Sequence, residues 1–344
     1  MKAMVLHERG GILRHEEAPR PQVGFGEALV RVRACGAGLT VVHIMQGRIG
    51  STAFPRIIGH EIAGEVVEVG EGVTTVQQGD RVVVYFYLTC GHCRWCDSGR
   101  EDLCVNFKGF VGVHIDGGFA EYVKLPARNL VHIPPELDYT EAAIIADAVS
   151  TPLHALRERV KLRPPETVMV VGAGGGVGIH AVQMAKALGG RVIGVDVSDE
   201  KLALVRNLGA DEVINARAFP AFDEEARRLT AGQGVDAVLD FVSHPETLQA
   251  SLRSLGTAGR LVVLGISPDM TLSFNAAQLI RSEIVVTGSR YVTRPELAET
   301  IELVRQGKVK PVVTHTFSLA ETNRALELVE QGQIAGRAVV VIPE

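Results

Sequence analysis

Short apolar runs divided by glycine turns fill the first part of the chain. Runs rich in valine are separated by turn-like stretches such as GEGV and QQGD, and they cover residues 27–32, 61–69, 80–87 and 120–125. Closely spaced short runs bounded by turn residues are typical of antiparallel or barrel-like β structure. The pattern therefore predicts a β-rich unit from residue 1 to about residue 150.

The pattern changes at Glu166, where apolar runs begin to alternate with amphipathic stretches. The apolar runs predict strands at 168–171, 191–196, 212–214, 235–242, 260–265 and 283–287. Helical periodicity fits 177–188, 200–208, 222–229 and 247–255. Six strands with intervening helices predict a parallel, doubly wound sheet in residues 151–288, so the chain is expected to belong to the α/β class.

The last part of the chain is too short for a core of its own. Its pattern predicts a helix at 295–306, a strand at 312–317, a helix at 319–331 and a strand at 338–342. We expect residues 289–344 to return to the β-rich unit, with the proline-containing KLRPPE at 161–166 as the entry to the second unit.

Charge and hydropathy limit the classes of partner. The 344 residues carry a formal net charge of −5 without a block of Lys or Arg, so no nucleic-acid partner is expected. Glycines, His180, Gln183 and Lys186 interrupt the most apolar window, 167–188, and the first eleven residues, MKAMVLHERGG, do not form a signal peptide. We expect a soluble, cytoplasmic protein with no membrane contact.

Four of the five cysteines lie within fifteen residues of each other. Cys90, Cys93, Cys96 and Cys104 follow the spacing C-x2-C-x2-C-x7-C, which lets four thiolates surround one ion. Four sulfur ligands are the closed tetrahedral set of structural zinc, while an iron–sulfur cluster is the alternative with overlapping spacing. A zinc ion held in this way has no open coordination position and is expected to stabilise a lobe.

A glycine-rich turn lies between the first predicted strand and helix of the second unit. The sequence VMVVGAGGGVG places Gly172, Gly175 and Gly178 where a backbone can approach a pyrophosphate at a helix N-terminus. The next predicted strand ends at Asp196, eighteen residues after Gly178, where a carboxylate that binds the ribose hydroxyls is expected. Such a carboxylate would repel a 2′-phosphate, so NAD is favoured over NADP.

The chain resembles the zinc-containing alcohol dehydrogenases of the medium-chain dehydrogenase/reductase family. The resemblance is carried by the two features above and by five further segments: GHEIAGEVVEVGEGV at 59–73, GDRVVV at 79–84, GGFAEYVKLP at 117–126, GADEVIN at 209–215 and GRAVVV at 336–341. The resemblance implies a GroES-like catalytic domain (1–150 and 289–344), a Rossmann domain (151–288) and a homodimer or homotetramer. It implies that the cofactor is bound by Gly172, Gly175, Gly176, Val177, Gly178, Asp196, Lys201 and Arg337.

The resemblance also implies a second, catalytic zinc. Its expected ligands here are His60, Glu61 and Asp147, but Gly38 stands where the family has a cysteine. The three remaining residues could hold zinc with water in the fourth position. Alternatively, the site holds no metal and hydrogen-bond donors of the protein polarise the carbonyl. In a third alternative, Cys35 moves in to replace the missing thiolate.

Thr40 and His43 match the proton relay of the family, which passes the alcohol proton away from the site during hydride transfer.

The leading hypothesis for the function is an NAD-dependent alcohol dehydrogenase or carbonyl reductase. The alternatives are a zinc-independent reductase of activated C=C bonds and a non-catalytic NAD-binding protein. The substrate is expected to contact residues within 44–54, 85–88 and 290–292.

Overall fold

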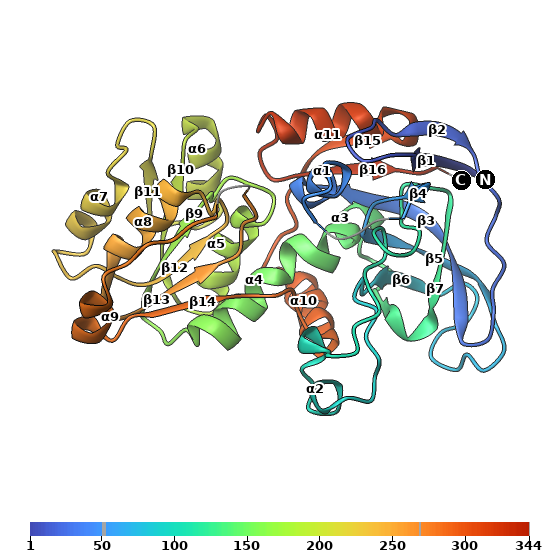
Figure 1. The fold of residues 1–344 in the computed structure, drawn as a ribbon, viewed down its shortest axis with the longest axis horizontal. Helices are drawn as coiled ribbons and strands as arrows, with labels where there is room; N and C mark the ends of the chain where they lie inside the picture. Colours follow the sequence, from blue (N-terminus) through green and yellow to red (C-terminus); the bar gives the residue numbers. More distant parts are fainter. Residues whose placement is uncertain (50–52, 268–269, 344) are drawn as a thin grey trace. The chain divides into compact units, whose positions relative to one another are not determined.

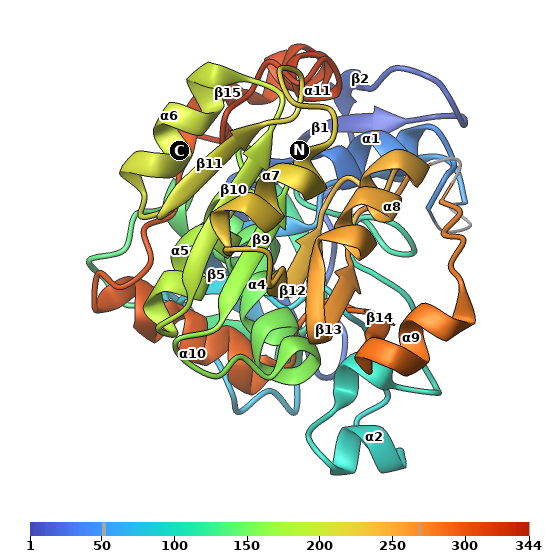
Figure 2. The same ribbon diagram turned by 90° about the vertical axis from the view of Figure 1, so that its left-hand side faces the viewer.

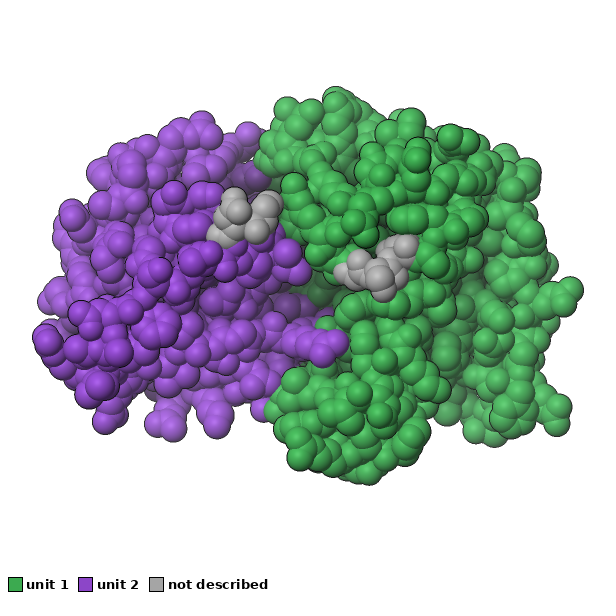
Figure 3. Space-filling view, viewed as in Figure 1, with its two compact units in different colours: residues 1–150, 292–306, 311–344 green, residues 151–291, 307–310 purple. Residues whose placement is uncertain are grey.

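The computed structural model describes residues 1–49, 53–267 and 270–343 of the chain (Figure 1). The chain forms two compact units (Figure 3). Unit 1 contains residues 1–150, 292–306 and 311–344, and unit 2 contains residues 151–291 and 307–310. The predicted α/β class is confirmed, with a β-rich unit 1 and a parallel sheet in unit 2.

Unit 2 is built on a six-stranded sheet whose neighbouring strands all run parallel. The order across it is β11 (Glu212–Asn215), β10 (Arg191–Asp196), β9 (Thr167–Val171), β12 (Val235–Asp240), β13 (Leu255–Val263) and β14 (Val285–Gly288) (Figure 2). The chain proceeds from β9 to one edge and then returns to build the other side. This reversal places a topological switch point between β9 and β12, where doubly wound sheets bind ligands.

Helices connect these strands: α5 (Gly178–Ala187), α6 (Asp199–Asn207), α7 (Phe222–Leu229), α8 (Pro245–Ser254) and α9 (Ala276–Ser282). The strands form continuous apolar runs because both faces of a parallel sheet are covered. Met169, Ile193, Val238 and Leu261 are completely buried in one core cluster, and burial of each such side chain contributes about 1.5–3 kcal/mol. Among the described residues, no helix has the length and apolar character needed to cross a membrane.

Unit 1 contains a small and a large sheet. The small sheet has the order β2 (Arg14–Glu17), β1 (Lys2–Leu6) and β4 (Arg56–Ile57). The large sheet has the order β15 (Val313–Ser318), β16 (Arg337–Val341), β3 (Glu27–Ala37), β5 (Glu61–Val69), β6 (Arg81–Val84) and β8 (Leu130–His132), while β7 (Tyr122–Pro126) pairs with the first half of β3. The long strand β3 therefore has β16 and β5 as its neighbours near its end.

The helical segments of unit 1 are short: α1 (Leu39–Met45), α2 (Arg94–Asp97), η1 (Glu101–Leu103), η2 (Ala127–Asn129), α3 (Tyr139–Ile144), η3 (Ile145–Val149), α10 (Arg294–Arg305), η5 (Leu319–Glu321) and α11 (Thr322–Glu330). The apolar pattern of the first 150 residues did not predict α1, α3 or η3. The segment η3 has π-helical hydrogen bonding. It precedes α4 (Thr151–His154), in which Pro152 lacks an N–H and cannot donate to the preceding turn. A second π-helical segment, η4 (Ala155–Val160), follows α4.

Candidate active site

The four cysteines of the predicted zinc site come together in unit 1. Cys93 stands at the N-cap of α2 and Cys104 directly follows η1. Sγ–Sγ distances are 3.6 Å for Cys93–Cys96, 3.9 Å for Cys93–Cys104 and 3.9 Å for Cys90–Cys96. A tetrahedral ion with Zn–S bonds of about 2.3 Å separates its sulfur atoms by roughly 3.8 Å. The spacing therefore suits one zinc ion, whereas a cluster of several irons would separate the thiolates further.

The surroundings of Cys93 favour a thiolate in this lobe. The backbone N–H of Cys96 is the largest influence on Cys93 and lowers the pKa of that thiol to about 6, whereas burial raises the pKa of Cys96. The backbone N–H of Cys90 donates to Sγ of Cys104 over 3.3 Å. Deprotonated sulfur is the form that binds metal. The four residues are thus suited to zinc by position, and Cys93 also by its lowered pKa.

The glycine-rich turn joins β9 to α5 as the sequence predicts. Gly172 has φ of +79°, a conformation that favours glycine, and the N–H groups of Gly172 and Ala173 both donate to the carbonyl of Val195 on β10. A Cβ on Gly178 would overlap the carbonyl of Gly172, so this glycine allows the helix to begin close to the turn.

Asp196 at the end of β10 is tied to the same turn. The backbone N–H of Gly174 donates to its Oδ2 over 2.9 Å, and the N–H groups of Val197 and Ser198 donate to its Oδ1. An added Cβ on Gly174 would approach both this carboxylate and the stem of Lys201. Asp196 and Lys201 therefore lie beside the turn, where the resemblance places them.

His180, to which the sequence pattern assigns no role, is buried in α5. Its Nδ1 lies 2.8 Å from the carbonyl oxygen of Gly176 in the turn. The residue is therefore a positioning group for the turn. Its signal in the sequence is a polar side chain four residues after a glycine, in a helix whose neighbouring positions are apolar.

The three predicted ligands of the second metal meet in unit 1, where His60 directly precedes β5, Glu61 is its first residue and Asp147 lies in η3. One potential ligand atom from each lies within 4.8 Å of the others. Nε2 of His60 is 3.2 Å from Oδ2 of Asp147, while the buried Nδ1 of His60 has no hydrogen-bond partner among the described residues. The rings of His60 and Phe86 pack in a T-shaped arrangement, with centroids 4.7 Å apart.

The Glu61 carboxylate is occupied by Arg337. Nε of Arg337 donates to Oε2 over 2.9 Å and Nη2 donates to Oε1 over 2.6 Å, while the N–H of Ala148 donates to Oε1 over 3.1 Å. Burial raises the pKa of the Glu61 carboxyl, and the Arg337 charge opposes that shift. Both side chains are buried. The metal-binding role of His60, Glu61 and Asp147 thus stays a prediction, as does the cofactor-binding role of Arg337.

Gly38 and Cys35 differ in what surrounds them. Gly38 is the N-cap of α1 and has φ of −133°, so its backbone would accept a side chain. A Cβ there would overlap the Arg337 guanidinium. Cys35 lies on the opposite face of β3, with Sγ packed beside Gly59 and Gly118, and burial raises its pKa well above the ordinary thiol value. Cys35 is not part of the group of ligand atoms that His60, Glu61 and Asp147 form, which argues against its service as a replacement ligand.

Thr40 and His43 lie three residues apart on α1, so one face of the helix carries both. Each side chain is half-buried. Burial, and then the charge of Arg48, lowers the pKa of His43, while Glu330 acts in the opposite direction. The pair is placed on one element, and its relay role stays a prediction.

The residues expected to line a substrate site are described in part. Positions 50–52 within the predicted segment 44–54 lie outside the described residues. Tyr85 to Leu88 are buried, and the hydroxyl of Tyr85 donates to the carbonyl of Val292 over 3.0 Å.

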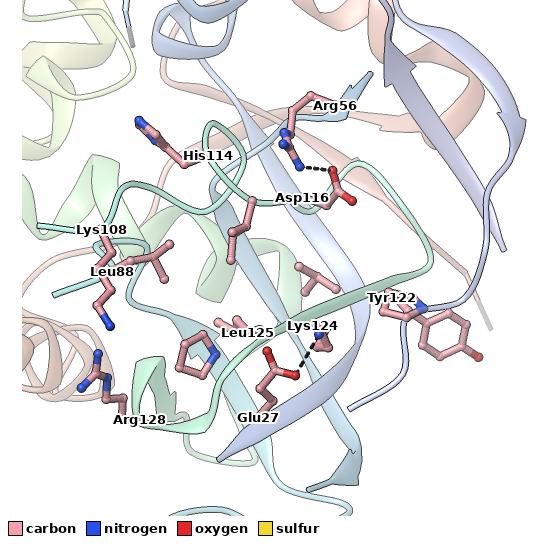
Figure 4. Close-up of a pocket in the computed structure, with 14 residues that line it drawn as sticks. Glu27, Arg56, Leu88, Lys108, His114, Asp116, Tyr122, Lys124, Leu125 and Arg128 are labelled. Carbon is pink, nitrogen blue, oxygen red and sulfur yellow. Dashed lines mark hydrogen bonds and ion pairs between the residues drawn. The ribbon is translucent and has the colours of Figure 1, made fainter. Parts of the chain in front are cut away.

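A separate pocket of about 450 Å³ lies in unit 1 (Figure 4). Two ion pairs line it, Arg56–Asp116 at 2.9 Å and Lys124–Glu27 at 2.8 Å. The residues that line it include none of the predicted catalytic, metal or cofactor residues.

Comparisons with known proteins agree with this architecture. A family model described as alcohol dehydrogenase GroES-like domain matches residues 24–135, and one described as zinc-binding dehydrogenase matches residues 176–306. The chain is 38% identical to an NAD-dependent alcohol dehydrogenase of Sulfolobus acidocaldarius, over 99% of this chain and 100% of the relative. It is 34% identical to an acryloyl-coenzyme A reductase of Metallosphaera sedula, over 99% of both chains. The crystal structure of an alcohol dehydrogenase from Aeropyrum pernix matches with a TM-score of 0.92 and 35% identity, over 99% of this chain and 100% of that chain.

Proposed function

The chain belongs to the zinc-containing alcohol dehydrogenase family, and on this basis we propose that it is an NAD-dependent oxidoreductase that interconverts an alcohol and an aldehyde or ketone. The observation that carries the proposal is the pairing of Asp196 with the glycine-rich turn at the switch point of a parallel sheet. A bound nicotinamide supplies the position that accepts or donates hydride. The chain supplies binding, orientation and proton transfer.

The cofactor is proposed to lie along the turn of unit 2. The N–H groups at the start of α5 would face the pyrophosphate, while Asp196 and Lys201 would contact the adenosine ribose. Residues in these roles are Gly172, Gly175, Gly176, Val177, Gly178, Asp196 and Lys201. The cysteine lobe would hold one zinc ion through Cys90, Cys93, Cys96 and Cys104, and this ion would stabilise structure without an open coordination position.

Proton transfer is proposed to involve α1. An alcohol loses a proton when its carbon loses hydride, and the Thr40 hydroxyl would accept this proton and relay it toward His43. The lowered pKa of His43 supports this role because, at any given pH, more of the imidazole is neutral and able to accept a proton than in a histidine with the ordinary pKa.

A second candidate function is reduction of an activated C=C bond. It is supported by Gly38, which removes a family metal ligand, and by the similarity to a protein named acryloyl-coenzyme A reductase. In that reaction hydride adds to the carbon β to a carbonyl, and hydrogen bonds to the carbonyl oxygen can stabilise the developing enolate.

One substrate panel distinguishes the candidates. The purified protein would be assayed with primary and secondary alcohols plus NAD, and with ketones, enones and enoyl thioesters plus NADH, by nicotinamide absorbance. Turnover of alcohols and ketones supports the first proposal, and turnover restricted to enones or enoyl thioesters supports the second. No turnover of any of them would overturn both in favour of a cofactor-binding role.

We also propose a cytoplasmic homo-oligomer. Strand β14 is an edge of the sheet in unit 2, and the exposed side chains of Val285 and Ile280 lie on or near it. Unpaired edge strands with exposed apolar groups favour association. All five cysteines are free of disulfides, which suits a reducing compartment. Light scattering of the purified protein tests the oligomeric state.

A further inference from the structure

Two glycines, Gly36 on β3 and Gly38 directly after the end of that strand, leave a space that a side chain would normally fill. Residues 36 and 38 face the same side of this extended segment because successive side chains alternate. Gly36 lies opposite Glu61 of β5, and the register of β16 places Arg337 next to Gly38. A Cβ on Gly36 would overlap the Glu61 carboxylate, and a Cβ on Gly38 would overlap the Arg337 guanidinium. The ion pair therefore crosses β3 through room that only these two glycines provide.

The charges of this pair oppose a metal ion. Two hydrogen bonds from Arg337 and one from Ala148 hold the Glu61 carboxylate in place. The guanidinium of Arg337 balances the charge of one of the two carboxylates, Glu61 and Asp147. A buried divalent cation would have to lie among these groups beside an existing positive charge, in surroundings that screen charge poorly. His60, Glu61 and Asp147 therefore have the spacing of a zinc site but not its charge.

We infer that Arg337 is the resident cation of this site, that it occupies the place where the family has a thiolate ligand, and that it excludes the second metal. Gly38 leaves the room that the guanidinium fills, because a side chain at this position would overlap it. The inference concerns the same site as the proposed function, and it rests on that proposal only for the site's role in the reaction.

Metal content tests this inference without reference to turnover. The full-length protein is saturated with zinc alone or with cobalt alone, freed of excess, and analysed by mass spectrometry. The wild type is expected to hold about one ion per chain, in the cysteine lobe. The matched variant Arg337→Met, which keeps His60, Glu61 and Asp147 and removes the positive charge, is expected to hold about two.

Cobalt distinguishes the two positions, because thiolate ligands give an intense charge-transfer absorption that nitrogen and oxygen ligands do not. The second ion in Arg337→Met should add weak ligand-field bands only. In Gly38→Cys/Arg337→Met, where the guanidinium no longer blocks the side chain, the second ion should add thiolate absorption. Gly38→Cys alone should add neither, because Arg337 still occupies the space. Arg337→Met/Glu61→Gln serves as the control, in which both charges of the pair are gone and affinity for a second ion should fall at least ~10-fold below that of Arg337→Met.

Arg337→Met leaves a buried carboxylate unpaired, which can make its recovery depend on zinc. In that case its thermal midpoint should keep rising with zinc concentration after the cysteine lobe is filled, while that of the wild type does not, which again supports the inference. Two zinc ions per chain in the wild type would overturn it, whatever the variants do. Failure of every substrate in the panel would overturn the proposed function and leave the metal count unaffected.

Discussion

The backbone N–H of Gly174 donates a hydrogen bond to Oδ2 of Asp196 over 2.9 Å, which joins the glycine-rich turn to the end of the neighbouring strand. The other oxygen, Oδ1, accepts from the backbone of residues 197 and 198. A carboxylate has about four lone-pair sites, and these three bonds leave one of them on Oδ2. The same group can therefore hold the turn in shape and accept a ribose hydroxyl of a cofactor.

Asp196→Ala should lower kcat/KM for NADH by about 10- to 100-fold, because a hydrogen bond to a charged group contributes about 1.5–3 kcal/mol. The preference for NADH over NADPH should narrow, since the repulsion of a 2′-phosphate is removed. Steady-state kinetics with both cofactors measure this change. Asp199→Ala, a carboxylate removed from the exposed start of α6, is the control and should change neither value much. Equal use of NADH and NADPH by the wild type would contradict the assignment.

Cys93→Ser should release the zinc of the cysteine lobe and lower thermal stability, because a serine hydroxyl is a poor replacement for a thiolate in a four-sulfur site. The effect on kcat of the protein that remains folded should be smaller than the effect on stability, since a closed site performs no chemistry. Zinc analysis and calorimetry measure the two effects. Cys35→Ser is the matched control and should keep the zinc. Undiminished zinc in Cys93→Ser would show that the lobe does not need this ligand.

The fold class follows from periodicity where the apolar runs are long enough to be buried on both faces. The pattern predicted a strand over 191–196, and β10 has the same limits, Arg191–Asp196. It placed another strand at 260–265, whereas β13 covers Leu255–Val263. The first residues of β13 read LGTAG and contain few apolar side chains, and Ala258 has φ of +59°. The first residue of β13 is therefore determined by hydrogen bonding within the sheet, which the pattern of apolar residues does not reveal.

The functional residues likewise divide into those that local spacing predicted and those that it did not. Cysteine spacing predicted the zinc lobe because its ligands are close in the sequence. The approach of His60 to Asp147, separated by 87 positions, came from the family resemblance. The Glu61–Arg337 pair joins residues 276 positions apart and was not predicted. It depends on β5 and β16 both neighbouring β3, and on two glycines whose effect is visible only when the neighbouring side chains are in place.

His43 predicts a pH dependence of alcohol oxidation. As a base it must be neutral, and its pKa lies below the ordinary value of 6.5 because of burial and Arg48. The proton-accepting form therefore persists to lower pH than a free histidine would allow, and the acid limb of kcat/KM should lie at lower pH than an ordinary histidine would give. His43→Gln should remove this limb and lower the rate about 10²-fold or more. A pH profile of kcat/KM measures both, and a limb retained in the variant would assign it to another group.

Arg48→Gln tests the cause of that shift. Loss of the neighbouring positive charge should move the acid limb toward higher pH, because protonation of His43 becomes easier. Glu330→Gln should move it in the opposite direction, since Glu330 favours the protonated imidazole. The two variants should therefore shift the acid limb of kcat/KM in opposite directions. Shifts in the same direction in both would contradict the assignment of the limb to His43.

Glu101 ties the cysteine lobe to α10, and this contact yields the last prediction. The Glu101 carboxylate in η1 is buried, and its Oε1 accepts from the backbone N–H of Arg294 over 2.9 Å and from its Nε over 3.2 Å. Glu101→Ala leaves that N–H unsatisfied at the first residue of α10 and should cost about 2–4 kcal/mol of unfolding free energy. Arg294→Ala keeps the backbone bond, and its side chain is one-third exposed, so it should cost about 1–2 kcal/mol. Denaturant unfolding of both single variants and of the double variant gives the coupling energy between the two residues.

The same contact predicts how firmly the lobe holds zinc. If the lobe depends on the contact, Glu101→Ala should lose zinc to a chelator faster than the wild type does. Arg324→Ala, which removes an exposed ion pair on α11, is the control and should not. Additive single effects, with an unchanged rate of zinc loss, would show that the lobe is held by its metal alone.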